Sequence, residues 1–142
     1  MTPDKLFSMC GPLALAGWAI LVFAGRMKWA APLVSGAIIP LLFGILYASL
    51  IGAHWGESKG SFSTLEGVAA LFENHWLLLA GWVHYLAFDL FVGSWEVRDS
   101  MKNGISHWVV IPCLLLTFLF GPMGLLLYFL VRMVRVRTLR IA

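Results

Sequence analysis

The chain alternates between long apolar runs and short polar segments. Four apolar runs are each close to the ~20 residues that a helix needs to cross the hydrocarbon core of a bilayer. They cover about residues 6–25, 32–53, 76–95 and 108–131. Helices satisfy their own backbone hydrogen bonds in lipid. The pattern therefore predicts an all-α integral membrane protein with a single domain, built as a four-helix transmembrane bundle.

The polar connections refine this bundle. The first is short, which makes the first two helices antiparallel neighbours. The second covers about residues 56–75 and contains Ser63-Thr64-Leu65-Glu66, a helix start with an acid in its first turn. Apolar residues then recur at amphipathic spacing, which predicts a short interfacial helix between the second and third spans. Within the fourth run, Gly121-Pro122-Met123-Gly124 either breaks the helix or permits close helix contact.

Composition and charge agree with a membrane protein. Hydrophobic residues make up 61% of the chain and charged residues 12%, about half of the charged fraction of soluble domains. A basic tail follows the last run: Arg132, Arg135, Arg137 and Arg140. Such arginines set orientation and meet anionic headgroups, so we expect no nucleic-acid partner. Counted by loop, lysine and arginine place both termini in the cytoplasm. No transit peptide precedes the first run, so we expect a bacterial inner membrane.

The third run carries an aspartate near its middle. A carboxylate at that depth costs roughly 3 kcal/mol or more, so it marks a functional site by default. On a helix, Tyr85 and Glu96 share a face with Asp89, at spacings of four and seven residues. His84 is rotated from Asp89 by about 140°. His84 and Asp89 would therefore meet only in a curved pocket shared with neighbouring helices.

This arrangement suggests acid–base chemistry on a hydrophobic substrate. Asp89 is the candidate proton donor, and Tyr85 lies one turn away to contact the carboxylate or the substrate. Glu96 would lie near the membrane interface on the same stripe, and His84 or His107 is the candidate base or relay. The alternative is a structural Asp89 that is hydrogen-bonded to another helix, a common role for polar groups in membrane bundles.

Cofactor and metal sites find little support in the sequence. His54, His75 and His107 stand at the ends of apolar runs, and no CxxCH motif is present, which argues against haem. Glu96, Asp99 and His107 have no recognised metal-ligand spacing and are more typical of a solvated loop. We therefore expect neither a cofactor nor a metal ion.

Several segments resemble one known family. They are Trp82-Val83-His84, Phe88-Asp89-Leu90-Phe91, Asp99, His107, Pro112-Cys113-Leu114-Leu115 and Gly121-Pro122-Met123-Gly124-Leu125. Together they resemble the abscisic-acid-deficient-4-like family of small four-helix membrane proteins, most strongly over residues 77–132. By this resemblance, His84 and Asp89 correspond to a histidine and an aspartate on the third helix of the family. His107 corresponds to the histidine that precedes the fourth.

The resemblance implies carotenoid chemistry. The plant member is linked to the conversion of violaxanthin to neoxanthin, in which an epoxide opens and an allene forms. Such an isomerisation needs an acid and a base but no redox cofactor. We therefore expect an intramembrane isomerase acting on a carotenoid or related isoprenoid lipid. The alternative is a non-catalytic accessory subunit or pigment-binding scaffold with a membrane-protein partner or a second copy of itself. A channel or transporter is the weakest of the three readings.

Overall fold

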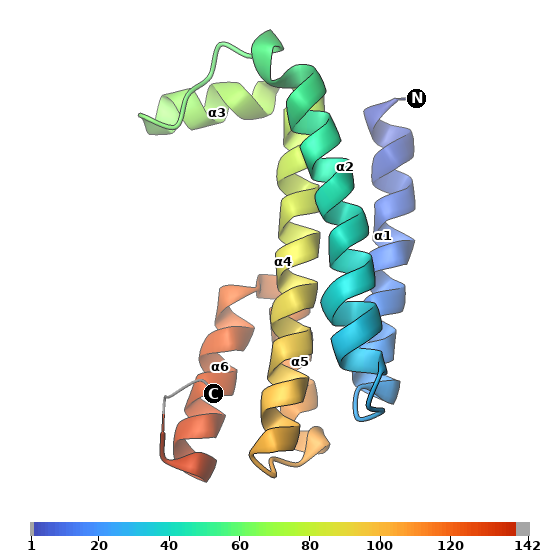
Figure 1. The fold of residues 1–142 in the computed structure, drawn as a ribbon. Coiled ribbons are helices and arrows are strands. Elements are labelled where there is room, and N and C mark those ends of the chain that lie inside the picture. Colours follow the sequence, from blue (N-terminus) through green and yellow to red (C-terminus); the bar gives the residue numbers. More distant parts are fainter. Residues whose placement is uncertain (1, 139–142) are drawn as a thin grey trace.

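The computed structural model describes residues 2–138, and this part of the chain is helical throughout, with no strand (Figure 1). The elements in order are α1 (Pro3–Ala19), η1 (Ile20–Ala24), η2 (Ala30–Ile38), α2 (Ile39–His54), η3 (Trp55–Glu57), α3 (Leu65–Glu73), α4 (His75–Lys102), α5 (His107–Phe120) and α6 (Pro122–Val136). The predicted all-α class is confirmed.

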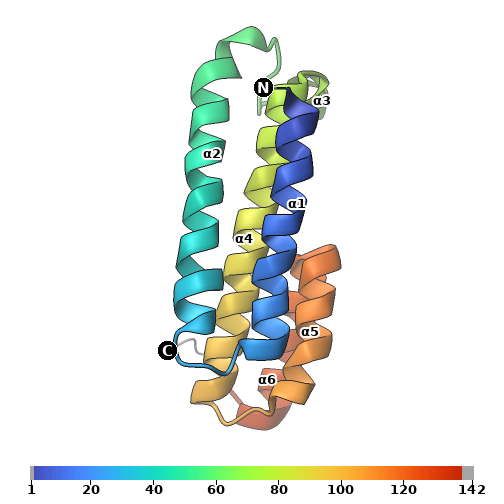
Figure 2. The same cartoon turned by 90° about the vertical axis from the view of Figure 1, so that its right-hand side faces the viewer.

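Three continuous helical stretches are long and apolar enough to cross a membrane. They cover Pro3–Ala24, Ala30–Glu57 and His75–Lys102, and they correspond to the first three predicted spans. The third extends seven residues beyond the predicted end at residue 95. The extra residues include Glu96 and Asp99, which neighbouring helices cover and so remove from water. The predicted antiparallel pairing of the first two spans is also found (Figure 2).

The fourth predicted span is not one helix. α5 has 14 residues, about 21 Å in length, which is shorter than a ~30 Å hydrocarbon core. Gly121 follows with a φ of 42°, a conformation that glycine adopts readily, and Pro122 begins α6. α6 then runs back beside α5 (Figures 1 and 2). The expectation of one span over residues 108–131 is therefore corrected to an α5–α6 hairpin.

This reversal separates the two ends of the described chain. The end of α6, the η1–η2 turn and the α4–α5 loop all lie at one end of the bundle, which we call the lower end (Figure 1). The start of α1 lies at the opposite, upper end, with α3 and the end of α2. In a membrane that the bundle crosses, the start of α1 and the end of α6 would lie on opposite sides, whereas the sequence predicted both termini in the cytoplasm. Arg140 lies outside the described residues.

The predicted interfacial helix is confirmed as α3. Thr64 caps it, because the Thr64 hydroxyl accepts a hydrogen bond of 3.0 Å from the backbone N–H of Gly67. The helix lies across the upper end, roughly at right angles to the long helices (Figure 1). Leu71 is its buried residue, and Phe72 lies against Gly81 of α4. α3 thus covers part of the upper half of α4.

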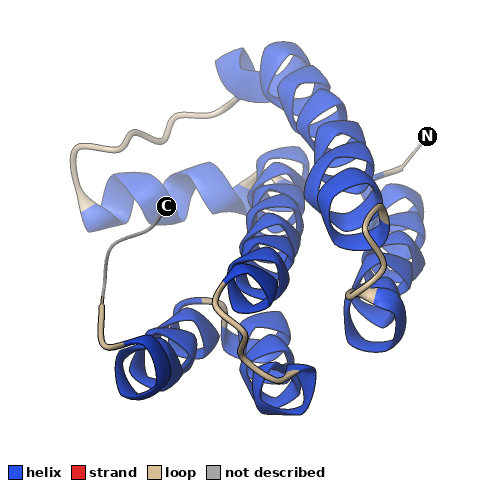
Figure 3. Ribbon diagram, turned by 60° about the horizontal axis from the view of Figure 1, so that its bottom comes forward, coloured by secondary structure: helices blue, strands red, loops and turns tan. Residues whose placement is uncertain are grey.

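α4 occupies the centre of the bundle, with the other long helices around it (Figure 3). Polar side chains fasten η2, which like η1 has the wider turns of a π-helix. The Ser35 hydroxyl donates to the carbonyl of Gly17 at 2.9 Å, and the Ser94 hydroxyl donates to the carbonyl of Ala31 at 2.6 Å. α4 is therefore held against η2 on one side and against the hairpin on the other.

Candidate functional site

Four polar residues follow one face of α4. Tyr85, Asp89, Glu96 and Asp99 all contact the α5–α6 hairpin. We call this side of α4 the hairpin face. The stripe that joins Tyr85, Asp89 and Glu96 was predicted from helical spacing, and the contacts are consistent with it. The three acids of the hairpin face, Asp89, Glu96 and Asp99, differ in how they contact the hairpin.

Asp99 is fully engaged with α6. Its Oδ2 accepts hydrogen bonds from the Tyr128 hydroxyl at 2.7 Å and from Nε of Arg132 at 2.8 Å. Its Oδ1 accepts a further bond from Arg132 at 3.4 Å. Asp99 and Arg132 are both buried, and Tyr128 lies one turn before Arg132 on α6. Asp99 is therefore a structural acid and does not lie in a solvated loop as predicted. Arg132 is likewise not part of a basic tail that meets anionic headgroups, because it is buried against Asp99.

Glu96 is sealed between α4 and α5. The Thr117 hydroxyl donates to Oε1 of Glu96 at 2.9 Å, whereas Oε2 is buried without a hydrogen-bond partner in the described chain. The side chain has no exposed surface. The hairpin covers this part of α4, so Glu96 faces protein rather than membrane headgroups, and its depth relative to the membrane interface stays a prediction. A lipid substrate has no access to Glu96 in this arrangement.

Asp89 lies near the middle of α4, at the tip of the hairpin. A Cβ at Gly121 would lie 2.9 Å from Oδ1 of Asp89, so the absence of a side chain at Gly121 is what lets the carboxyl lie there. Oδ2 of Asp89 is buried without a hydrogen-bond partner among the described residues, although the residue as a whole is only half-buried. Asp89 is thus a partly accessible intramembrane acid with unused hydrogen-bonding capacity.

Tyr85 is the predicted neighbour that the structure does place beside Asp89. Its hydroxyl donates to the carbonyl of Phe118, near the end of α5, at 2.9 Å. That bond uses the hydroxyl proton of Tyr85, so the hydroxyl oxygen remains free to accept a hydrogen bond from a protonated Asp89. The bond also fixes the ring of Tyr85 next to the hairpin tip.

The two candidate histidines lie elsewhere. His84 is exposed on another side of α4, where its ring stacks on Phe88 with centroids 4.5 Å apart and lies 5.5 Å from the ring of Tyr47. His107 starts α5 at the lower end, and its Nε2 lies 2.9 Å from the carbonyl of Val22. The structure therefore brings Tyr85 to Asp89 but leaves both histidines apart from it.

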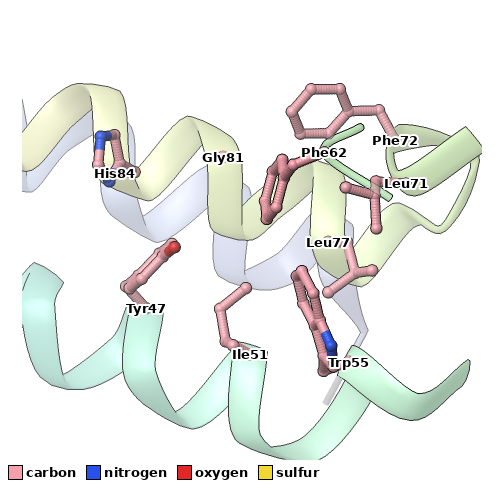
Figure 4. A pocket seen from close by; sticks show the side chains of 9 residues that line it. All are labelled: Tyr47, Ile51, Trp55, Phe62, Leu71, Phe72, Leu77, Gly81 and His84. Carbon is pink, nitrogen blue, oxygen red and sulfur yellow. The ribbon is translucent and has the colours of Figure 1, made fainter. Parts of the chain in front are cut away.

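A second site lies on the side of α4 that carries His84. We call this side of α4 the groove face. Its upper pocket encloses about 330 Å³ between α2, α3 and α4 (Figure 4). The lining residues are Tyr47, Ile51, Trp55, Phe62, Leu71, Phe72, Leu77, Gly81 and His84. Below it, a lower groove of about 320 Å³ is lined by Gly36, Ala37, Pro40, Leu41, Gly44, Ala87, Phe88 and Phe91.

A metal site is not formed by the acids and histidines of the described chain. Within residues 2–138, no three His, Cys, Asp or Glu side chains lie close enough together to hold a metal ion. Asp99 bonds to Arg132, and His107 contacts a carbonyl of η1.

Comparison with known proteins identifies the family. The chain matches the ABA4-like family model, described as ABA DEFICIENT 4-like, over residues 5–128. Neither a search of curated proteins nor a search of solved structures found a match. The matched region contains the three long helices, α5 and the hairpin tip, and therefore Tyr85, Asp89 and Gly121. Because the match covers most of its length, the protein belongs to the ABA DEFICIENT 4-like family.

Proposed function

We propose that this protein is an intramembrane acid–base isomerase that acts on a carotenoid or related isoprenoid lipid, with Asp89 as the reacting acid. The observation that carries the proposal is the state of the Asp89 carboxyl. It lies at mid-depth in the longest helix, is half-buried, and has an oxygen without a hydrogen-bond partner among the described residues. An acid kept at such a cost is best explained by chemistry on a substrate in the membrane.

A single carboxyl can supply both proton transfers of an epoxide isomerisation. Asp89 in its acid form would donate its proton to the epoxide oxygen, and the C–O bond would break to leave a hydroxyl and a carbocation. The resulting carboxylate would then remove a proton from a neighbouring carbon, and the C–H electrons would form a new C=C bond. The acid form is restored and the atoms balance, so no redox partner is required.

Of the other candidate residues, only Tyr85 is given a part in this step. Tyr85 is proposed to orient the Asp89 carboxyl, because it is the polar side chain fixed beside it. Glu96 is sealed by Thr117, and His107 is occupied at the lower end. His84 lies on the groove face, in contact with Tyr47 and Phe88. A proton relay from a histidine to Asp89 is therefore not part of the proposal.

The test is conversion of a defined lipid by the purified protein. Liposomes that contain an epoxide-bearing carotenoid would be incubated with the protein and the pigments separated by chromatography. We expect an isomeric product with the wild type and at least a hundredfold less with Asp89→Asn, the scale of general acid–base catalysis. Glu73→Gln, a matched removal of an exposed acid on α3, should convert normally. Full activity of Asp89→Asn contradicts the proposal.

The alternative of a pigment-binding scaffold is favoured by the upper pocket, which supplies a cavity without requiring chemistry. It predicts a bound pigment and no turnover. An absorption spectrum of the protein as purified, recorded together with the conversion assay, separates the two functions, because a scaffold would show pigment bands but no product.

The orientation of the protein in its membrane is a further part of the proposal. The upper end holds two basic residues of the described chain, Lys5 and Lys59; the lower end holds Arg26, Lys28, Arg98, Lys102, Arg132, Arg135 and Arg137. Basic loops stay in the cytoplasm, so the lower end should face the cytoplasm. Labelling of Ser63→Cys and Ser106→Cys in whole cells checks this. An impermeant reagent should modify only the former.

A further inference from the structure

Two hydrogen-bonding side chains line the upper pocket, Tyr47 from α2 and His84 from α4. Neither the Tyr47 hydroxyl nor the His84 ring is hydrogen-bonded to another described residue, and both line the upper pocket. Figure 4 shows them on facing helices, at the end of the pocket away from Trp55. His84 lies about 13 Å below the start of α4, at 1.5 Å per residue. At that depth water is scarce, so the two groups need a ligand to satisfy them.

The walls of the pocket are suited to a flat ring. Trp55 and Phe62 lie toward its upper end, and Phe72 of α3 lies over Gly81 (Figure 4). Aromatic rings pack favourably against other aromatic rings in stacked or edge-on geometry. A volume of about 330 Å³ lies within the range of small-molecule pockets, which combine apolar walls with a few polar groups. The pocket therefore fits a planar ring that carries hydrogen-bond acceptors.

The lower groove continues from the polar end of the pocket. His84 stacks on Phe88 at 4.5 Å, and Phe88 lines the lower groove. Tyr47 lies one turn from Gly44, which lines the same groove. The groove has apolar walls and presents almost no polar surface. An apolar chain attached to the ring would therefore pass Tyr47 and His84 and then follow α2 and α4 toward the lower end.

We infer that the upper pocket and lower groove together bind a prenylated quinone, with the ring above and the prenyl chain below. In such a molecule a carbonyl oxygen stands next to the ring carbon that bears the chain. This places an acceptor at the junction where the Tyr47 hydroxyl and the His84 N–H can donate. The site is separate from Asp89, which lies on the hairpin face, and the inference goes beyond the proposed isomerase activity. It includes no redox step.

The test is saturable quenching of tryptophan fluorescence in detergent micelles by a short-chain menaquinone. Trp55 lines the pocket, so a bound quinone should quench it, and Trp55→Phe should lose most of the saturable signal. Geranylgeraniol, which has a prenyl chain without the ring, should compete weakly. β-Carotene, whose end rings lack oxygen, should also compete weakly. Equal competition by either lipid would overturn the inference in favour of a general apolar groove.

Two kinds of variant locate the site. Tyr47→Phe and His84→Phe keep the aromatic rings but remove a donor, and each should weaken quinone binding roughly fivefold. Gly81→Leu should abolish saturable quenching, because a Cβ at this position already lies 2.8 Å from Phe72. Gly11→Leu on α1 has no atom within 4 Å of the added Cβ and should bind normally. Unchanged affinity in both Tyr47→Phe and His84→Phe would overturn the inference.

Asp89→Asn separates this inference from the isomerase proposal. The variant should bind the quinone like the wild type, because Asp89 does not line the pocket or the groove. A loss of quinone binding in this variant would contradict the separation of the two sites. A failure of lipid conversion would leave the binding result standing.

Discussion

The two faces of α4 differ in whether the protein itself forms hydrogen bonds to the polar side chains there. On the hairpin face, Asp99 receives hydrogen bonds from Tyr128 and Arg132, and Glu96 receives one from Thr117. On the groove side, His84 of α4 and Tyr47 of the facing α2 line a cavity and make no hydrogen bond to the rest of the described chain. Polar groups that neighbouring helices bond and seal from lipid and water are structural, whereas accessible groups without a hydrogen bond to the protein mark places where a ligand is expected.

Asp89 lies on the hairpin face, but like Tyr47 and His84 it has a polar atom without a hydrogen bond to the described chain. The backbone of Gly121 at the hairpin tip lies against its carboxyl, and Oδ2 is left without a hydrogen-bond partner in the described residues. The difference between Asp99 and Asp89 on one helix face follows from where the hairpin ends. A hairpin that stops at mid-depth seals the lower acids and leaves the middle one available.

The largest expected effect is on the sealed part of the hairpin face. Arg132→Leu removes the cation from Asp99 and leaves a buried carboxylate uncompensated. We expect the free energy of unfolding to fall by about 3–5 kcal/mol, measured by denaturant titration in mixed micelles. Asp99→Leu combined with Arg132→Leu should recover much of the loss, because no unpaired charge then remains.

Arg135→Leu is the matched control, since Arg135 is exposed on the same helix. It should change stability by less than about 0.5 kcal/mol. If Arg132→Leu is no more destabilising than Arg135→Leu, the buried ion pair does not hold the hairpin to α4, and the contrast between the two faces loses its main support.

A smaller loss is expected at the hairpin tip. Gly121→Ala places a Cβ against the Asp89 carboxyl at a φ of 42°, a conformation that costs roughly 1–3 kcal/mol for other residues. Gly104 also has a positive φ, but no atom lies within 4 Å of a Cβ added there. The loss of stability in Gly104→Ala therefore measures the cost of the backbone conformation without a side-chain clash. Equal losses in the two variants would show that Gly121 is not needed for the approach to Asp89.

The smallest effect is expected at Thr117. Thr117→Val keeps the shape of the side chain but removes the hydroxyl that donates to Glu96, which should cost about 1–2 kcal/mol of unfolding free energy. Thr117→Ser keeps the donor and serves as the control for the bond. A neutral Thr117→Val would mean that Glu96 is satisfied without Thr117, which weakens the assignment of Glu96 as a structural acid.

Much of the architecture could be predicted from sequence, because hydropathy and helical spacing are local. The three long spans, the capped interfacial helix after Thr64 and the placement of Tyr85 with Asp89 follow from such patterns. The rotation of His84 away from Asp89 was equally predictable from 100° per residue. These features need no knowledge of which helices become neighbours.

The features that could not be predicted from the sequence depend on which helices pack against one another. An apolar run interrupted by Gly121-Pro122 is compatible with a kinked span as well as a hairpin, because neighbouring helices can satisfy the freed backbone groups. Arg132 was assigned to a basic tail that meets anionic headgroups, because its partner Asp99 lies 33 residues away in the sequence. The pair Tyr128 and Arg132, one turn apart, was the available signal of an α6 face that meets an acid.

The measurement that tests the account most directly applies one substitution to two acids of the same helix face. Asp89→Asn and Asp99→Asn would be compared for unfolding free energy and for conversion of the epoxide-bearing lipid. We expect the unfolding free energy of Asp89→Asn to lie within about 1 kcal/mol of that of the wild type, while conversion of the lipid is lost. Asp99→Asn should be clearly less stable, because Arg132 then lacks its carboxylate partner. Normal conversion by Asp89→Asn, or equal destabilisation of the two variants, would contradict the account.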